Sequence, residues 1–281
     1  PTLIDHTIAF LDPPDTTNAF PPVSAYVFQA QSDRTFKNPK PIYIDWDAYT
    51  WGAPFGFNFR KQNGADSYDL YLAFGDPALA DGNRLQKTSL NFAAADLNLG
   101  KIERVAGNLV KSVWQLTPLN IPGPASQAGN PSSTLYGGGA SGFLFWDDES
   151  LPTTQREIFF ATEAADGTFG SKQTVGLANA GSDKYQPYFH GDTLYYSLLH
   201  GLILSQRLPN SASDLTQATS WAPPATEIGL DTAHMHSGRI SAIGEPSLYI
   251  DADGKRWLYF AYAVATTGSN LDLNIGRVKE K

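Results

Sequence analysis

Apolar and polar residues follow one another along this chain mostly with the two-residue period of a β-strand. Residues 192–197 (DTLYYS) and 256–264 (RWLYFAYAV) are short runs rich in aromatic and aliphatic side chains, which favour strands. A short polar or glycine-containing link separates each run from the next. The best helical candidate, residues 92–99, is short, so we expect an all-β protein. The predicted strands are residues 68–74, 142–146, 157–162, 187–190, 192–197, 202–205, 248–250, 256–264 and 271–278.

Turn residues and a repeated unit predict how these strands are organised. Asp253-Gly254 and Gly191-Asp192 each separate two strands, and glycine accepts the positive φ of a tight hairpin. Residues 183–197 and 243–260 both run through a polar residue, Pro, a short strand, an Asp/Gly turn and a Leu-Tyr-aromatic strand. Weaker copies are expected in residues 139–162 and 20–28.

Repeats of about 40 to 60 residues, each a small antiparallel sheet, are typical of a β-propeller. We therefore predict one propeller domain over residues 1–281 with five blades. Six blades remain the alternative, because residues 52–139 have room for an additional blade. Residues 3–11 are expected to close the propeller beside residues 271–278.

Charge and composition exclude several classes of function. The net charge of −8 argues against a nucleic-acid partner, which would require a basic face. The chain has no cysteine, so disulfides and thiolate sites are excluded, and no run approaches the roughly 20 apolar residues of a membrane span. The chain begins at Pro1 rather than Met, so we expect a secreted or periplasmic protein whose leader has been removed. We also expect a monomer.

The segment 245–260 resembles two propeller families. One is the TolB-like repeat, whose units read acidic residue, Pro, strand, Asp-Gly turn and strand; residues 161–170 resemble it too. The other is the group of five-bladed arabinanases and xylosidases, whose blades open with a carboxylate followed by Pro. The second resemblance implies a carbohydrate-active enzyme, a glycoside hydrolase or lyase, with an axial pocket for an oligo- or polysaccharide. The first implies a non-catalytic binding or scaffold propeller that recognises a protein or a glycan.

In those glycosidases the active carboxylates lie at the start of innermost strands, which by resemblance points to Glu245 and Asp183. Glycoside hydrolysis needs two carboxyl groups, and the candidates for the second are Asp45 and Asp47, which have aromatic neighbours. The chain departs from the family, because the family's acids lie in the first four blades whereas Glu245 is in the last predicted unit. In the alternative interpretation, Glu245 hydrogen-bonds a loop between blades.

Histidines form a second candidate site. His234 and His236 lie two residues apart, so in an extended segment both imidazoles face one side and can reach one divalent metal ion. Asp231 could add an oxygen ligand, and His190 or His200 a third imidazole. The spacing resembles the metal motif of propeller oligogalacturonate lyases. The alternative is that these histidines bind loop carbonyls.

Two acidic segments are expected to be structural. Residues 147–149 (DDE) predict a solvated loop. Residues 251–254 (DADG) lack the later ligands of a calcium loop and predict a hairpin turn.

Overall fold

The computed structural model describes sixteen segments of the chain. Among them the only helical element with defined bounds is a single 3-10 turn, Ala218–Ser220, and no helix is long and apolar enough to cross a membrane. The all-β prediction is confirmed. The described residues are 25–30, 36–42, 54–61, 67–74, 85–91, 104–105, 108–109, 117–123, 128–134, 142–150, 155–178, 181–208, 214–230, 240–251, 253–265 and 271–279.

The chain divides into two compact units, Pro1–Asn120 and Ile121–Lys281, and each is described by itself. The prediction of one domain over the whole chain therefore stays a prediction. The first unit contains a four-stranded sheet in the order β3-β4-β5-β8 and two two-stranded sheets, β1-β2 and β6-β7. Its strands are β1 (Ala25–Ala30), β2 (Phe36–Ile42), β3 (Pro54–Lys61), β4 (Ser67–Phe74), β5 (Leu85–Asn91), β6 (Arg104–Val105), β7 (Asn108–Leu109) and β8 (Thr117–Pro118).

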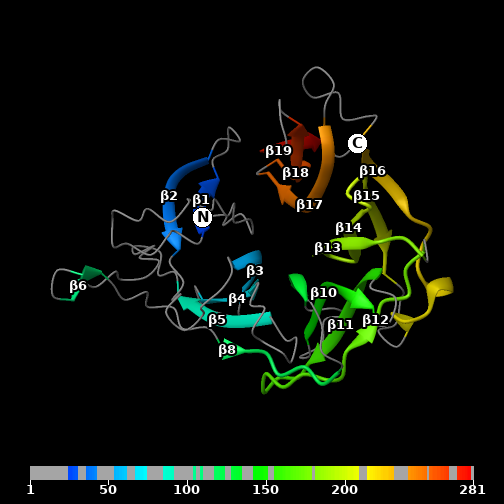
Figure 1. Cartoon of the computed structure of the whole chain (residues 1–281), viewed down its shortest axis with the longest axis horizontal. Coiled ribbons are helices and arrows are strands. Elements are labelled where there is room, and N and C mark those ends of the chain that lie inside the picture. The colour runs from blue at the N-terminus through cyan, green and yellow to red at the C-terminus, as the bar shows by residue number, and fades with distance from the viewer. Residues whose placement is uncertain are drawn as a thin grey trace. The chain divides into compact units, whose positions relative to one another are not determined.

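The second unit consists of three antiparallel sheets in which strands adjacent in sequence are adjacent in space (Figure 1). Such consecutive meanders are the blades of a β-propeller. The first sheet is β9 (Gly129–Thr134), β10 (Gly142–Ser150), β11 (Gln155–Glu163) and β12 (Gln173–Thr174). The second is β13 (Lys184–His190), β14 (Thr193–Leu198), β15 (Leu202–Arg207) and β16 (Ala225–Gly229), and the third is β17 (Ile240–Ile250), β18 (Arg256–Ala265) and β19 (Leu271–Lys279).

The first strands of these three blades lie next to one another, since β13 packs against both β9 and β17. We call the first strands β9, β13 and β17 the innermost strands. Residues 187–190 and 248–250, predicted as strands, fall within β13 and β17, which confirms these two strands. The predicted hairpins are confirmed as well: Gly191 (φ +60°) and Gly254 (φ +75°) form the turns after these two strands.

The middle blade buries both of its faces because neighbouring residues of a strand point to opposite sides. Phe189 belongs to the hydrophobic cluster shared with the preceding blade, where its ring lies 4.1 Å from that of Phe145. Tyr188 belongs to the cluster shared with the following blade, together with Leu248 and Phe260. Each fully buried side chain of this size stabilises the fold by roughly 1.5–3 kcal/mol. This two-sided packing holds the innermost strands in register with one another.

The first strands of four sheets carry the same irregularity. In β3, β9, β13 and β17 the pairing with the next strand is interrupted by a bulge that contains a residue with positive φ. In β9, β13 and β17 that residue precedes Pro, which is tolerated in a bulge because its missing N–H is not needed for the ladder. The four residues are Gly56 (φ +63°), Asn130 (φ +42°), Gln186 (φ +55°) and Glu245 (φ +51°).

Two details of the copy predicted in residues 139–162 change. Its first strand lies earlier, in β9, and residues 147–149, predicted as a loop, belong to β10, which continues to Ser150 before β11 starts at Gln155. Among described residues, four sheets have three or four strands, and the β1–β2 ribbon overlaps the copy predicted in residues 20–28. The blade number of five or six stays a prediction. Residues 3–11, predicted to close the propeller, lie outside the described residues.

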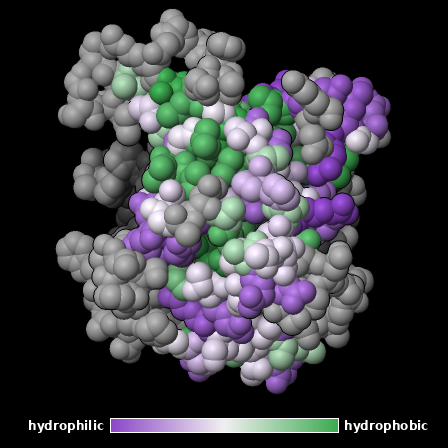
Figure 2. Space-filling model, turned by 90° about the vertical axis from the view of Figure 1, so that its right-hand side faces the viewer, coloured by the Kyte–Doolittle hydropathy of each residue, from purple (hydrophilic) through white to green (hydrophobic). Residues whose placement is uncertain are grey.

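Part of the surface of the described residues is hydrophobic. In Figure 2 hydrophobic side chains gather in the upper and central part of the visible face, and hydrophilic ones at its right edge and in its lower half. Among the described residues, the exposed large hydrophobic ones are Leu199 and Leu230 in the middle blade and Ile250, Ile275 and Val278 in the last blade. Scattered exposed hydrophobic residues are normal on soluble proteins. The candidate site is therefore better sought along the innermost strands.

Candidate functional site at the innermost strands

The bulge residues Asn130, Gln186 and Glu245 share an unusual backbone. All three have positive φ, a conformation that costs a residue with a side chain of the order of 1 kcal/mol. Strained residues of this kind concentrate at functional sites, where the surrounding structure holds them in place. Because one lies on each innermost strand of the second unit, they define the candidate site.

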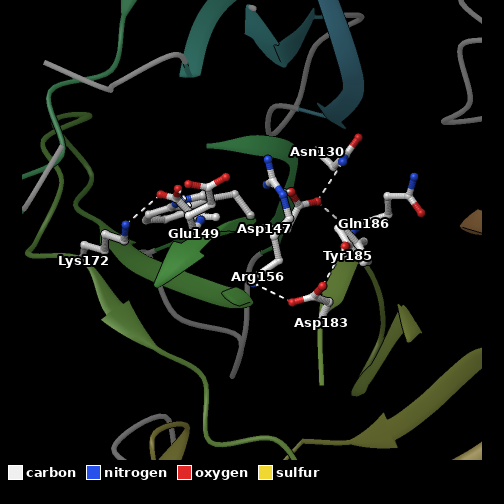
Figure 3. A network of polar contacts seen from close by, with 10 residues as sticks. Asn130, Asp147, Glu149, Arg156, Lys172, Asp183, Tyr185 and Gln186 are labelled. Carbon is white, nitrogen blue, oxygen red and sulfur yellow. Dashed lines mark hydrogen bonds and ion pairs between the residues drawn. The ribbon is translucent and has the colours of Figure 1, made fainter. Parts of the chain in front are cut away.

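Asp147 in β10 ties two of these bulges together (Figure 3). Its Oδ2 accepts hydrogen bonds from Asn130 Nδ2 at 2.7 Å and from the backbone N of Gln186 at 2.8 Å. Its Oδ1 forms an ion pair with Arg156 Nη1 at 2.6 Å. The Asp147 side chain is buried, which raises its pKa, and the Arg156 guanidinium opposes that rise. Asp147 thus fixes the β13 bulge of the next blade from within its own sheet.

Asp148, the next residue, points to the opposite face of the sheet and is also buried. Its carboxylate accepts hydrogen bonds from Lys172 Nζ at 2.7 Å, the backbone N of Glu149 at 2.7 Å and Trp146 Nε1 at 3.3 Å. The prediction of a solvated acidic loop at residues 147–149 is therefore wrong. The two aspartates belong to a strand, and each has a cationic partner that compensates its burial.

Asp183, a predicted catalytic carboxylate, lies just before β13 and has both oxygens occupied. Oδ1 accepts the backbone N–H of Arg156 at 2.9 Å, and Oδ2 accepts the hydroxyl of Tyr185 at 3.1 Å. The Tyr185 ring is stacked on His200, with 4.0 Å between ring centroids. This arrangement gives Asp183 a structural role between β11 and β13, and a catalytic role for it stays a prediction.

Glu245 differs from the other acidic residues of the site. Its backbone N donates to Gln186 Oε1 at 3.0 Å, whereas its carboxyl makes no hydrogen bond or ion pair with any residue that the structure describes. The side chain reaches solvent, yet the protein around it displaces enough water to raise the pKa of the carboxyl. The hydrogen bond between blades predicted for Glu245 thus comes from its backbone, and its carboxyl is left accessible.

The two described histidines of the predicted metal site are far apart. His190 pairs with Thr193 at one end of the β13–β14 hairpin, and His200 follows the other end, where Lys184 pairs with Leu198. Six strand residues separate the two ends, or roughly 20 Å, so one ion cannot bind both imidazoles. Burial lowers the pKa of both histidines, and for His190 the cation of Arg256 adds to the effect.

His200 is the histidine that neighbours the connection between β16 and β17. Its carbonyl accepts the backbone N–H of Ile243 at 2.8 Å, and the carbonyl of Gly201 accepts that of Leu230 at 3.1 Å. Within the described segments no group of three or more His, Cys, Asp and Glu side chains could hold a metal ion. The predicted ligands outside the described residues are Asp231, His234 and His236, and the predicted carboxylates outside them are Asp45 and Asp47.

Asn130, Gln186 and Asp147 were not predicted from the sequence to be site residues. A signal for the first two was present, since a residue with a side-chain amide or carboxyl precedes Pro at positions 130, 186 and 245, at intervals of 56 and 59 residues. These intervals agree with the predicted length of a blade. Asp147 had no such signal, because its role depends on a contact with the following blade.

The sequence matches no protein-family model and no curated protein. Solved structures with a similar fold include a thermostable family-43 glycoside hydrolase, with a TM-score of 0.57 and 12% identity over 90% of this chain and 81% of that one. An endo-arabinase from Bacteroides thetaiotaomicron VPI-5482 has a TM-score of 0.54 and 15% identity, and the match covers 99% of this chain and 95% of that one. An N-acetylgalactosamine deacetylase from F. plautii has a TM-score of 0.55 and 11% identity, and the match covers 99% of this chain and 89% of that one. At these identities the likeness is one of fold, and it confirms the β-propeller.

The resemblance of residues 245–260 to five-bladed arabinanases and xylosidases agrees with these structural neighbours. The resemblances to TolB-like repeats and to the lyase metal motif stay predictions. By that resemblance a blade opens with a carboxylate before Pro. Here Asn130 and Gln186 stand before Pro in β9 and β13, and Glu245 alone is acidic in β17. The second unit thus presents two amides and one carboxyl at corresponding positions.

Proposed function

We propose that this chain is a carbohydrate-active hydrolase that cleaves a glycosidic bond of an oligo- or polysaccharide, with Glu245 as the general acid. The observation that carries the proposal is the Glu245 carboxyl. It is accessible and unpaired among the described residues, it lies on a strained bulge, and protein around it raises its pKa. A general acid needs a carboxyl that retains its proton near the working pH. The fold shared with glycoside hydrolases supports the same class of reaction.

In this mechanism Glu245 gives its proton to the glycosidic oxygen as the bond to the anomeric carbon breaks. Water supplies the hydroxyl group that the anomeric carbon gains. A second carboxyl either removes a proton from that water or first attacks the sugar itself. We propose Asp45 or Asp47 for this second role. Once the reaction is complete the proton balance is restored, since the proton lost from Glu245 is replaced by one from water.

The test is a hydrolysis screen with the full chain on arabinans, xylans, galactans and glycans that contain N-acetylated amino sugars. Glu245→Gln should lower kcat by about 10²- to 10⁴-fold, the usual contribution of a general acid. Asp253→Asn is the matched control, because it removes an exposed carboxyl from the turn after β17 and should leave the rate unchanged. Equal activity of wild type and Glu245→Gln would exclude the proposed role.

The second candidate is a non-catalytic glycan-binding propeller, and the amides Asn130 and Gln186 favour it. A side-chain amide both donates and accepts hydrogen bonds, which suits sugar hydroxyls but provides no proton. For this candidate, calorimetry should detect binding of an intact glycan without product formation. Glu245→Gln should then bind that glycan with wild-type affinity. For either function we propose a secreted or periplasmic monomer.

A further inference from the structure

Gln186 reaches from β13 to the backbone of β17. Its Oε1 accepts the backbone N–H of Glu245 at 3.0 Å. The carboxamide lies directly against Gly244, where a Cβ atom would overlap with Oε1. The side chain of Gln186 and the missing side chain of Gly244 therefore fit each other, and together they determine how closely the two innermost strands approach.

Glu245 needs such a contact. Its φ of +51° is unfavourable for a residue with a side chain, and the bulge removes the ladder partner that its N–H would otherwise have. The hydrogen bond to Gln186 satisfies this N–H in the observed conformation. Gln186 is itself fixed, because its own N–H donates to the buried carboxylate of Asp147. The conformation of Glu245 is thus set by a series of contacts that begins in β10.

We propose that Gln186 is a positioning residue for Glu245: its hydrogen bond holds the β17 bulge in the conformation that directs the carboxyl to the reacting glycosidic oxygen. The proposal rests on the proposed function, in which Glu245 is the reacting acid. A neutral amide suits this position, because its oxygen accepts the N–H as a carboxylate would without placing a second negative charge beside Glu245.

Two substitutions of Gln186 should act in opposite directions on the titration of Glu245. Gln186→Leu keeps the size of the side chain but removes the acceptor, so the bulge should relax and the Glu245 pKa should fall towards the ordinary range. Gln186→Glu keeps the acceptor and adds a negative charge, so the Glu245 pKa should rise further. A general loss of stability would not produce shifts of opposite sign.

The measurement is a carbon-13 NMR titration of the full chain with labelled glutamate side chains, in which the Glu245 signal is assigned by its loss in Glu245→Gln. Ser197→Ala is the matched control. It also removes a hydrogen bond between β14 and β17, from Ser197 Oγ to the carbonyl of Ile243 at 3.0 Å, but it does not touch the bulge. Glu245 should titrate in this control as in wild type.

On a hydrolysed glycan, Gln186→Leu should lower kcat by about 10- to 100-fold with little change in KM, as expected for a misplaced catalytic group. Gln186→Glu should keep most of the rate at low pH. An unchanged Glu245 titration in Gln186→Leu overturns the positioning role, even if wild type hydrolyses a glycan. If wild type hydrolyses none, the proposed function fails while the titration still decides the role of Gln186.

Discussion

The Asp147 carboxylate accepts the backbone N–H of Gln186 at 2.8 Å, so the second strand of one blade holds the first strand of the next. The side chain of Gln186, on the first strand of that blade, accepts the backbone N–H of Glu245 on the first strand of the following blade. In both cases the N–H belongs to a bulge residue, whose place in the strand ladder is interrupted. Each of these N–H groups has lost its partner in the strand ladder and needs another acceptor. A side-chain oxygen from the neighbouring sheet provides it. The blades are thereby linked through their most strained residues.

Asp147→Asn should destabilise the protein by roughly 2 to 4 kcal/mol, because an amide has one acceptor oxygen where the carboxylate has two. Either Arg156 or the donors Asn130 Nδ2 and Gln186 N then lose their acceptor. Equilibrium urea unfolding measures the change. Asp192→Asn is the control, since its ion pair with Arg207 at 2.6 Å is exposed and should contribute only about 0 to 1 kcal/mol. Equal losses in the two variants would contradict the structural role of Asp147.

Glu245→Gln should raise the melting temperature at about pH 7 and have little effect at about pH 4. The sign follows from the pKa, which is higher in the folded protein than in the unfolded chain. The folded state then binds more protons, so ionisation of Glu245 costs stability as the pH rises through the folded pKa. Thermal unfolding across this pH range checks the prediction. A variant less stable than wild type at neutral pH would show that the carboxylate has a favourable partner.

Gly244→Ala should cost about 0.5–1.5 kcal/mol, because the new methyl group would displace the flexible end of the Gln186 side chain and break its hydrogen bond to the Glu245 N–H. Gly201→Ala is the matched control: its Cβ would make an ordinary contact of 3.6 Å with Leu230, and the change should stay within about 0.5 kcal/mol. Urea unfolding of both variants compares them. If Gly244→Ala were as stable as Gly201→Ala, the contact between Gln186 and Gly244 would not be as close as described.

The predicted metal site can be tested through its third imidazole. The carbonyls of His200 and Gly201 bind Ile243 in β17 and Leu230 just after β16, and His234 and His236 lie between these two residues in the sequence. His190 lies at the far end of the same hairpin. We therefore expect His200→Ala to lose a divalent ion that His190→Ala retains, as measured by elemental analysis of purified protein. The lowered pKa of His200 keeps its imidazole neutral to lower pH, which favours metal binding there. The double variant His234→Ala, His236→Ala should also contain no divalent metal ion. Absence of a metal ion from the wild-type protein would contradict the hypothesis.

The strands and hairpins could be predicted from sequence because their signals are local. The aromatic runs of β14 and β18 and the turn glycines Gly191 and Gly254 act over a few residues. The position of Pro246 likewise marked an innermost strand correctly. Each of these features depends only on residues that are neighbours in the chain.

The site could be predicted only in part, because its geometry depends on contacts between blades. Asp147 was predicted to lie in a solvated acidic loop, because the sequence does not reveal that Arg156, Asn130 and Gln186 surround it. Asp183 looked like a free acid, whereas Tyr185 and a backbone N–H occupy its carboxylate. Glu245 was identified by its place before Pro, but the strain of its backbone and its partner Gln186 became visible only in the folded chain.

The three bulge positions also have a consequence at the level of the gene. Codons for Asn and Asp differ by one base, and so do codons for Gln and Glu. Asn130 and Gln186 are therefore each a single nucleotide substitution away from a carboxyl in a backbone that already accommodates one at Glu245. At position 186 a carboxylate would still accept the Glu245 N–H. At position 130 it would lose the N–H that donates to Asp147 and would face that carboxylate instead. Under the proposed function, the change from an amide to a carboxyl at position 186 takes one point mutation and no change of architecture.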